Sequence, residues 1–267
     1  MKLTQSKPSK VVVTLPVYND MEFLSSTTAA IEETTKRIEG NFTLLIAEDG
    51  SDSSATVDEL KQKYPNIVHI QHDERLGRGR ALREAWKLVE GDVYVYVDVD
   101  LATNLAKFDA YRNLLLLQNQ FDLITGSRYI PASVTNRPRL RRSASIAYNW
   151  LVRFLFHTGV HDHQCGFKSF SHPLVDRLAV EAKSDSWFWD TEAIVVTKKM
   201  GFRVKEIPIE WAEKKGQRTP LKRLLNDVKL HGTGLLTLLY RVYFGDLHAT
   251  LSRTIIPARL TNTPGDV

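Results

Sequence analysis

The sequence lacks several features that would each define a class of protein. Its 267 residues include one cysteine, Cys165, so no internal disulfide can form and a cysteine-rich zinc site is excluded. The single cysteine also favours a reducing compartment. No stretch reaches the roughly 18 uncharged apolar residues of a membrane-spanning helix; the best candidate, residues 232–240, is bounded by Lys229 and Arg241. No apolar run follows Met1, so a secretory signal is not expected.

The remaining composition is that of an ordinary globular protein. Hydrophobic residues make up 43% and charged residues 25%, which excludes a disordered or collagen-like chain. The net charge of +5 is unevenly spread, because residues 198–229 contain ten basic and four acidic residues. Arg137, Arg139, Arg141 and Arg142 form a second basic cluster. Such clusters indicate an anionic partner such as phosphate, nucleic acid or a membrane surface, or else simply a solvated face.

Strand-like and helix-like segments alternate through the N-terminal half. Apolar and β-branched runs predict the strands, and apolar residues at helical spacing predict the helices. The expected strands are residues 10–15, 43–47, 68–71, 93–97 and 123–125, and the expected helices are residues 21–38, 53–64, 77–89 and 104–118. This order predicts an α/β fold with a doubly wound, mainly parallel sheet covered on both faces, with ligands at the carboxyl ends of its strands.

The C-terminal half has a different pattern. Residues 141–157 and 221–244 each predict a cationic amphipathic helix, although Gly232 and Gly234 could interrupt the second. Residues 202–211 alternate like a strand. The expected domains are a tail over residues 1–9, a catalytic domain over 10–230 with a membrane-interface helix at 141–158, a helical segment over 231–256 and a flexible tail over 257–267.

Two carboxylates, Asp98 and Asp100, follow a buried strand. Hard oxygen ligands at this place can hold Mg²⁺ or Mn²⁺, which would neutralise charge growing on a diphosphate leaving group. The alternative is that Asp100 caps the helix expected from residue 104. Asp49 is equally ambiguous: it could accept a hydrogen bond from a nucleobase, or serve a turn. Polar residues at four strand ends together predict a site with carboxylates at its floor.

Residues 75–80, Arg-Leu-Gly-Arg-Gly-Arg, open an expected helix and suit a phosphate, because glycines, a helix N-terminus and arginines all favour an anion. Their spacing matches neither the P-loop nor the dinucleotide-binding fingerprint. His161 and His163 flank Asp162, but a catalytic zinc site would need a third ligand and a general base, so zinc is not favoured. Cys165 is interpreted as a small buried residue rather than a nucleophile.

Taken together, these segments resemble the family 2 glycosyltransferases, which have the GT-A fold. The resemblance extends from about residue 11 to about residue 244. It is carried by Leu15-Pro16-Val17-Tyr18-Asn19-Asp20, Glu48-Asp49-Gly50-Ser51-Asp52, Arg75-Leu76-Gly77-Arg78-Gly79-Arg80-Ala81-Leu82, Asp98-Val99-Asp100 and Gly126-Ser127-Arg128. Residues 162–170, 210–211 and 216–218 are similar to the polyprenyl-phosphate sugar synthases.

Within that group the chain looks closer to the dolichyl-phosphate glucosyltransferases than to the mannose synthases. Leu101-Ala102-Thr103-Asn104 stands where mannose synthases usually have Leu-Gln-His-Pro, so the glutamine that also touches their metal is missing. Eukaryotic glucosyltransferases of this type carry an N-terminal membrane anchor that this sequence does not have. An archaeal member is therefore expected, bound peripherally at the cytoplasmic face of the cell membrane without a transmembrane span.

The resemblance implies sugar transfer from a nucleotide-sugar, best matched by UDP-glucose, to dolichyl or polyprenyl phosphate, with Mg²⁺ or Mn²⁺ as cofactor and with protein glycosylation as the use of the product. Asp98, Asp100 and Arg128 would be catalytic, and the two aspartates would hold the metal. The residues expected at the nucleotide are Pro16, Tyr18, Asn19, Asp20, Asp49, Asp52, Arg78 and Asp98. Those expected at the acceptor phosphate are Arg128, Arg141, Arg142, Ser145 and Arg218, and those at the sugar are Gln164 and Asp190.

The chemistry of such a transfer fits the absence of a convincing His–carboxylate pair. A phosphomonoester has a second pKa of about 6, so the acceptor is already a nucleophilic anion and no general base is required. The enzyme must instead hold two anions together, with arginines on the acceptor and a metal on the donor. A single displacement would invert the anomeric carbon, and the two cationic helices would lie on the bilayer.

Several alternatives stay open. The donor could be UDP-N-acetylglucosamine, another UDP-sugar or GDP-mannose. A nucleic-acid-binding protein would explain the basic clusters, but Trp187 and Trp189 lie outside them, and no nucleic-acid partner is expected. A noncatalytic scaffold fits poorly with the retained Asp98 and Asp100. A sugar-1-phosphate nucleotidyltransferase would need a glycine-rich loop after the first strand, where residues 16–19 are Pro-Val-Tyr-Asn.

Overall fold

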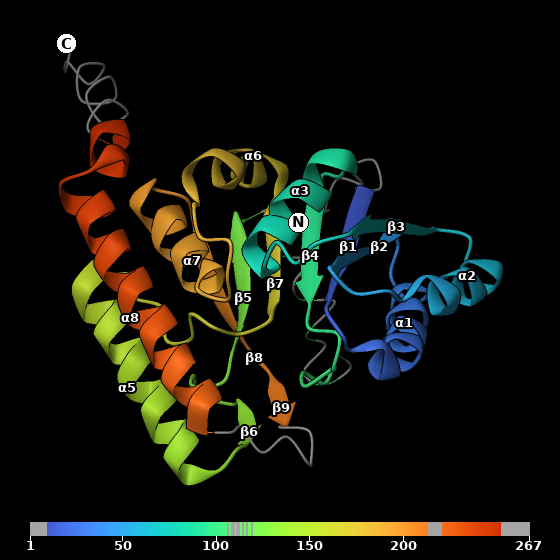
Figure 1. Ribbon diagram of the computed structural model, residues 1–267, viewed down its shortest axis with the longest axis horizontal. Coiled ribbons are helices and arrows are strands. Elements are labelled where there is room, and N and C mark those ends of the chain that lie inside the picture. Colours follow the sequence, from blue (N-terminus) through green and yellow to red (C-terminus); the bar gives the residue numbers. More distant parts are fainter. Residues whose placement is uncertain are drawn as a thin grey trace, which may run out of the picture.

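A seven-stranded sheet forms the centre of the molecule (Figure 1). The computed structural model describes residues 10–105, 120–212 and 221–251, together with residues 107, 110, 113, 115, 117 and 118. The strand order is β3-β2-β1-β4-β7-β5-β8, and β7 is antiparallel to both of its neighbours, whereas all other pairs are parallel. The strands are β1 (Lys10–Val17), β2 (Asn41–Asp49), β3 (Ile67–His72), β4 (Val93–Val97), β5 (Leu123–Ser127), β7 (Phe167–Ser171) and β8 (Val204–Pro208).

Helices cover both faces of the sheet. α1 (Met21–Thr35) and α2 (Ser54–Lys63) pack on one face, where Val11, Val13 and Leu15 of β1 belong to the same apolar cluster as Leu24 and Val57. The other face is covered by α3 (Arg78–Leu88), α6 (His172–Glu181) and α7 (Trp189–Lys199). Because β1 and β4 are buried on both sides, their sequences are nearly continuous apolar runs rather than alternations.

Two long helices lie beside each other outside α7 (Figure 1). α5 (Arg139–Phe156) and α8 (Leu221–Tyr243) are both amphipathic, and the buried Val152 and Phe156 of α5 join the same apolar cluster as Leu235 and Leu238 of α8. A small second sheet pairs β6 (Val134–Asn136) with β9 (Glu210–Ala212). None of the helices in the described ranges is long and apolar enough to cross a membrane.

The predicted doubly wound, mainly parallel α/β sheet is confirmed. The strand expected over residues 202–211 is two strands, because the chain leaves the large sheet after Pro208 and joins β6 from Glu210. α8 runs unbroken through Gly232 and Gly234, so the expected domain boundary between residues 230 and 231 falls inside one helix. Seven of the fifteen residues of the expected helix over residues 104–118, and both expected tails, lie outside the described residues.

Candidate functional site

Polar loops follow β1, β2, β4 and β5 on one edge of the sheet, because these strands are parallel to one another in the sheet. We call this the carboxyl edge and define it as residues 16–20, 48–53, 73–79, 98–101 and 126–128. The strand order reverses direction between β1 and β4, which is where ligands bind in doubly wound sheets. The structure thus gathers the polar strand ends at the switch point.

Asp98, directly after β4, is in contact with a guanidinium at the start of α3. Nη2 of Arg78 lies 2.8 Å from Oδ1 of Asp98. Burial raises the pKa of Asp98 to about 6; Asp100 adds to the rise and Arg78 opposes it. Burial also disfavours the charge on Arg78, but Asp98, Tyr96 and Asp190 outweigh it and raise the pKa of the guanidinium. This pair places one negative and one fixed positive charge at the centre of the edge.

The Arg78 guanidinium is held from several other sides. Nη1 donates to the Tyr96 hydroxyl at 2.6 Å and lies 3.4 Å from Oδ2 of Asp190. The Trp187 ring stacks on it, with its centroid 3.5 Å from Cζ. Asp190 in turn receives a hydrogen bond from Nζ of Lys168 at 2.6 Å, and that lysine is fully buried. Such a network fixes the arginine, because each buried charge would be costly without its partner.

Asp190 was predicted to contact the sugar. Its side chain is 3% exposed and both of its oxygens are engaged by protein groups: Oδ1 by Lys168, and Oδ2 by Tyr96 at 3.2 Å and by Arg78. The contact with Arg78 brings Asp190 to the same cluster as Asp98. Its expected role at the sugar stays a prediction.

Asp49 organises the loop that precedes α3. Oδ1 accepts hydrogen bonds from the backbone N–H groups of Leu76, at 2.5 Å, and Gly77, at 3.1 Å. Gly50 follows with φ of 73°, a conformation that side chains rarely adopt, and a Cβ there would clash with the backbone of Arg75. The predicted turn role of Asp49 is therefore what the structure shows, and its expected contact with a nucleobase stays a prediction.

The remaining residues expected at the nucleotide lie at the ends of β1 and β2. The centroid of the Tyr18 ring lies 3.9 Å from Cζ of Arg75. Asn19 is exposed with φ of 57°, and Asp20 precedes α1, where its carbonyl oxygen accepts a hydrogen bond from Phe23. Asp52 is exposed at the start of α2, and a hydrogen bond from the backbone of Ser54 lowers its pKa. Pro16, near the end of β1, is half-buried.

Arg128 is 7% exposed and forms a two-pronged pair with Asp162: Nε to Oδ2 at 2.7 Å and Nη2 to Oδ1 at 2.8 Å. Burial opposes the charge of Asp162, yet Arg128 holds its pKa below the usual range. The expected contact of Arg128 with the acceptor phosphate stays a prediction, and the pairing with Asp162 favours a structural role for this guanidinium.

Gly166 lies against Asp98. A Cβ at this position would clash with the Asp98 carboxylate, so a larger residue would displace that carboxylate.

The other residues expected at the acceptor lie on or near α5. Arg142 is exposed, Arg141 is half-buried, and Ser145 is buried at 9% exposure. Gln164 contacts α8, with its Nε2 3.1 Å from Nε2 of His231, and its expected role at the sugar stays a prediction. Arg218 lies outside the described residues.

The outer faces of α5 and α8 carry large apolar side chains in contact with solvent. Trp150 and Phe154 are 62% and 63% exposed and stack on each other with ring centroids 5.5 Å apart. Large exposed apolar patches are uncommon on soluble monomeric proteins and can mark interaction sites. We call this the α5–α8 surface and define it by Leu140, Ile146, Trp150, Leu151, Phe154, Val228, Leu236, Tyr240 and Phe244.

The residues that could hold a divalent cation are Asp98 and Asp100. Their hard carboxylate oxygens suit Mg²⁺ or Mn²⁺, and the partly exposed Asp98 is open to a ligand on one side. In the described ranges no group of three or more His, Cys, Asp or Glu side chains converges on one point. Two carboxylates supply part of the roughly six oxygen ligands that such a cation takes, so water or a phosphate group would have to supply the others.

His163 and Cys165 serve the interior. Burial lowers the pKa of His163 to about 3, and its ring bonds Asn149 and Thr158. Cys165 is 1% exposed, and burial raises the pKa of its thiol to about 12, so it is not a reactive thiolate. His161 binds Glu206 through Nδ1 at 2.8 Å. The burial of Cys165 agrees with its interpretation as a small buried residue, and both histidine rings bind other protein groups.

Three functional candidates were missed in the sequence. Trp187 was noted only as lying outside the basic clusters, yet it covers Arg78. Lys168 is a lone charge within an apolar strand, Phe-Lys-Ser-Phe, and that was the signal that could have revealed it. Tyr96 looked like one more apolar strand residue, and nothing in the sequence distinguished it from Tyr94.

Comparison with known proteins adds a family to this geometry. The model for the family described as Glycosyl transferase family 2 matches residues 12–180. Glycosyltransferase AglD of Haloferax volcanii is 38% identical over 218 residues, covering 80% of this chain and 35% of the relative. The dolichyl-phosphate beta-glucosyltransferase ALG5D of Trichomonas vaginalis is 27% identical over 226 residues, covering 79% and 68%. The chain thus spans about a third of the first of these relatives.

Two further comparisons bear on acceptor and fold. The polyprenol monophosphomannose synthase of Mycolicibacterium smegmatis is 27% identical over 253 residues, covering 91% of this chain and 89% of the relative. The solved glucosyl-3-phosphoglycerate synthase of Mycobacterium tuberculosis, in complex with Mn²⁺, UDP and its product, superposes with a TM-score of 0.64 at 15% identity, covering 86% and 80%. This likeness shows a shared GT-A fold.

Proposed function

The chain belongs to glycosyl transferase family 2, and on that premise we propose that it transfers a sugar from a nucleotide-sugar to polyprenyl or dolichyl phosphate. The observation that carries the proposal is the Asp98–Arg78 pair at the switch point of the sheet, 2.8 Å apart. A nucleotide-sugar donor has a diphosphate whose negative charge must be neutralised. Asp98 could do this by binding a cation, and Arg78 could do it by contacting the diphosphate directly. The family favours the enzyme over the nucleic-acid-binding and nucleotidyltransferase alternatives.

The donor is assigned to the carboxyl edge. Asp98 and Asp100 would hold Mg²⁺ or Mn²⁺, which supplies positive charge to the leaving diphosphate. Support comes from a structural neighbour that was solved with Mn²⁺ and UDP. Arg78 would contact the diphosphate, and Tyr18, Asn19 and the other residues at the end of β1 and β2 would surround the nucleoside. UDP-glucose is the preferred donor, because relatives include a dolichyl-phosphate beta-glucosyltransferase.

The acceptor is a phosphomonoester in this proposal. Its anionic oxygen attacks the anomeric carbon, the bond to the donor diphosphate breaks, and the nucleoside diphosphate leaves with the electron pair. Since the phosphate is already ionised, no side chain has to remove a proton. Arg141, Arg142, Ser145 and Arg218 are the proposed phosphate contacts, and Arg128 is held by its pair with Asp162.

The α5–α8 surface is proposed to lie on the lipid bilayer, as a peripheral attachment. Its aromatic side chains suit the boundary between headgroups and acyl chains, and Arg139 and Arg142 at the start of α5 suit anionic headgroups. The lipid phosphate would then reach the carboxyl edge from the membrane side. Protein glycosylation is the proposed use of the product.

A transfer assay with several donors tests this function. The protein is incubated with Mn²⁺, a short polyprenyl phosphate and labelled UDP-glucose, UDP-N-acetylglucosamine or GDP-mannose. We expect label to move into the organic phase with UDP-glucose, and to be lost in Asp100→Ala. Transfer only from GDP-mannose, as the name of one relative would suggest, would overturn the choice of sugar. Nucleotide-sugar binding without any lipid product would overturn the acceptor.

A further inference from the structure

Trp187 occupies an unusual position for a side chain that is 45% exposed. Its ring covers the Arg78 guanidinium with a centroid distance of 3.5 Å, on the segment just before α7. A guanidinium over an indole is attracted by the ring quadrupole, and desolvation strengthens the contact. Arg78 also pairs with Asp98. The contacts that position Trp187 therefore help to determine where the positive charge of the site lies.

The segment that carries Trp187, residues 183–188, is tied to α3. The backbone N–H of Gly79 donates to the carbonyl oxygen of Asp185 at 2.8 Å. Arg83 donates from Nη1 to the carbonyl oxygen of Ser184 at 2.7 Å and from Nη2 to Oδ1 of Asp185 at 2.6 Å. A Cβ at Gly79 would clash with Ser184 and Trp189, so the approach of α3 to this segment depends on glycine.

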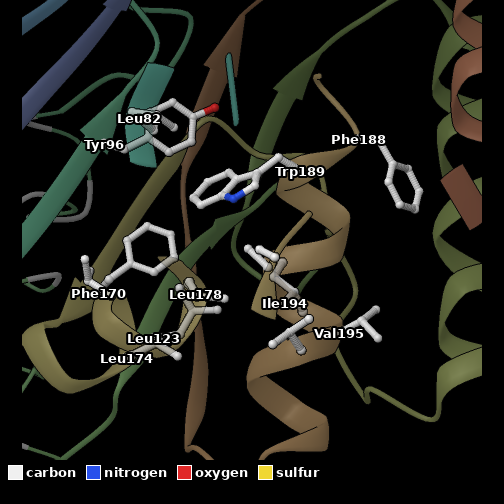
Figure 2. Packing of buried hydrophobic residues seen from close by; sticks show 14 of the residues in the cluster. Leu82, Tyr96, Leu123, Phe170, Leu174, Leu178, Phe188, Trp189, Ile194 and Val195 are labelled. Carbon is white, nitrogen blue, oxygen red and sulfur yellow. The ribbon is translucent and has the colours of Figure 1, made fainter. Parts of the chain in front are cut away.

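The same segment is tied to α8 from the other side. Phe188 points away from Trp189 and toward α8 (Figure 2), where a Cβ at Gly234 would lie 2.6 Å from the Phe188 ring. His231, one turn earlier on α8, also contacts that ring, with centroids 6.1 Å apart. α8 thus packs against the residue that directly follows Trp187.

A buried ion pair makes a second connection. Oε1 of Glu192 pairs with Arg241 of α8, while Oε2 accepts the backbone N–H groups of Ser184, at 2.6 Å, and Lys183, at 3.0 Å. Arg241 also donates to the carbonyl oxygen of Glu181 at 2.8 Å. α8 therefore fixes both ends of the segment, through Glu192 at its start and through Phe188 at its end.

We propose that Trp187 is a positioning residue, which holds the Arg78 guanidinium beside Asp98, and that the packing of Phe188 against Gly234 of α8 fixes where Trp187 lies. The inference rests on the proposed function only in taking Arg78 as a contact of the donor diphosphate. α8 thus has two separate faces: one carries exposed apolar side chains, and the other supports the residue that covers Arg78.

Binding of UDP with Mn²⁺, measured by calorimetry without lipid, tests the first half. We expect Trp187→Ala to weaken binding about tenfold and Trp187→Phe, which keeps a ring, to weaken it less than about threefold. In an Arg78→Ala background, Trp187→Ala should have no further effect. Wild-type affinity in Trp187→Ala would overturn the proposal. The same loss with and without Arg78 would do so too, because Trp187 would then touch the nucleotide itself.

A matched pair of glycines tests the second half. Gly232 and Gly234 lie on the same helix, but a Cβ at Gly232 would meet nothing within 4 Å. We expect Gly234→Ala to weaken UDP binding about threefold or more and Gly232→Ala to leave it unchanged. Phe188→Leu, which removes the ring instead of crowding it, is the second variant if Gly234→Ala does not fold. Equal binding in the two glycine variants, and in Phe188→Leu, would overturn the role of α8.

A readout without ligand separates this inference from the proposed function. The fluorescence of Trp187 is obtained as the difference between each variant and the same variant carrying Trp187→Phe. Acrylamide should quench that difference signal more in Gly234→Ala than in Gly232→Ala. If the wild type binds neither UDP nor GDP, the proposed donor fails, and the quenching still decides whether α8 fixes the position of Trp187: a difference supports that role, and equal quenching overturns it.

Discussion

The carboxyl edge and the α5–α8 surface differ in how their side chains are partnered. At the carboxyl edge the charged groups bind other protein groups: Arg78 binds Asp98, and Asp49 binds the loop before α3. On the α5–α8 surface the aromatic side chains are about 60–80% exposed and lie against solvent. The side chains of the edge are thus held by contacts within the protein, whereas the aromatic side chains of the surface are open to contact, in the proposed function with a lipid bilayer.

The largest effect is expected at Asp98. Asp98→Asn keeps the shape of the side chain but removes the charge that would hold the cation, so transfer should fall about 10³-fold or more. The measurement is kcat in the label-transfer assay. Asp176→Asn, at an exposed position on α6, is the control and should keep full activity. A decrease in kcat of less than tenfold in Asp98→Asn would contradict a role of the carboxyl edge in sugar transfer.

Breaking the Arg128–Asp162 pair should cost stability rather than only activity. Asp162→Asn leaves the buried Arg128 guanidinium without its counter-charge, so the free energy of unfolding should fall by about 3 kcal/mol. Denaturant unfolding measures it. If the free energy of unfolding falls by less than about 1 kcal/mol, water must reach the pair more freely than its burial indicates.

Gly50 tests whether the loop before α3 is tightly packed at the carboxyl edge. Gly50 and Gly159 have nearly the same φ, 73° and 72°, but only at Gly50 would a Cβ clash with a neighbouring backbone. Backbone strain should lower the free energy of unfolding of both alanine variants by about 1 kcal/mol, and the clash in Gly50→Ala should lower it by about 2 kcal/mol more. Equal losses in unfolding experiments would show that the loop can move away freely.

The α5–α8 surface should give the smallest change in stability. Trp150→Ala and Phe154→Ala remove side chains that are already exposed, so the free energy of unfolding should change by less than about 0.5 kcal/mol. Binding to vesicles with anionic lipids should nevertheless weaken about tenfold in the double variant, because the aromatic rings leave water on binding. Leu88→Ala, an exposed apolar residue on α3, is the control. Unchanged vesicle binding would contradict a lipid contact.

The two regions also differ in how much of them could be predicted. The order of strands and helices from β1 to β4 followed from apolar periodicity, because both faces of these strands are buried. The antiparallel β7 did not, since its insertion between β4 and β5 depends on long-range pairing. Periodicity also could not separate β8 from β9, because the chain changes sheets within one alternating run.

For the site, residue type and strand position were enough to bring Asp98, Asp49 and Arg78 together. They could not say which groups these side chains bind. Asp190 pairs with Lys168, 22 positions earlier, and Gln164 meets His231, 67 positions later. No local pattern in the sequence indicates either of these pairings. Trp187 was found only because the structure places its ring on Arg78.

Hydrogen–deuterium exchange in two steps tests most directly the claim that separate regions take the donor and the lipid. UDP with Mn²⁺ is added first, and vesicles containing polyprenyl phosphate follow. The account predicts that the first step protects residues 73–80 and 96–102, and that the second protects residues 139–156 and 226–244. The opposite order of protection, or vesicles that leave α5 and α8 unprotected, would contradict it.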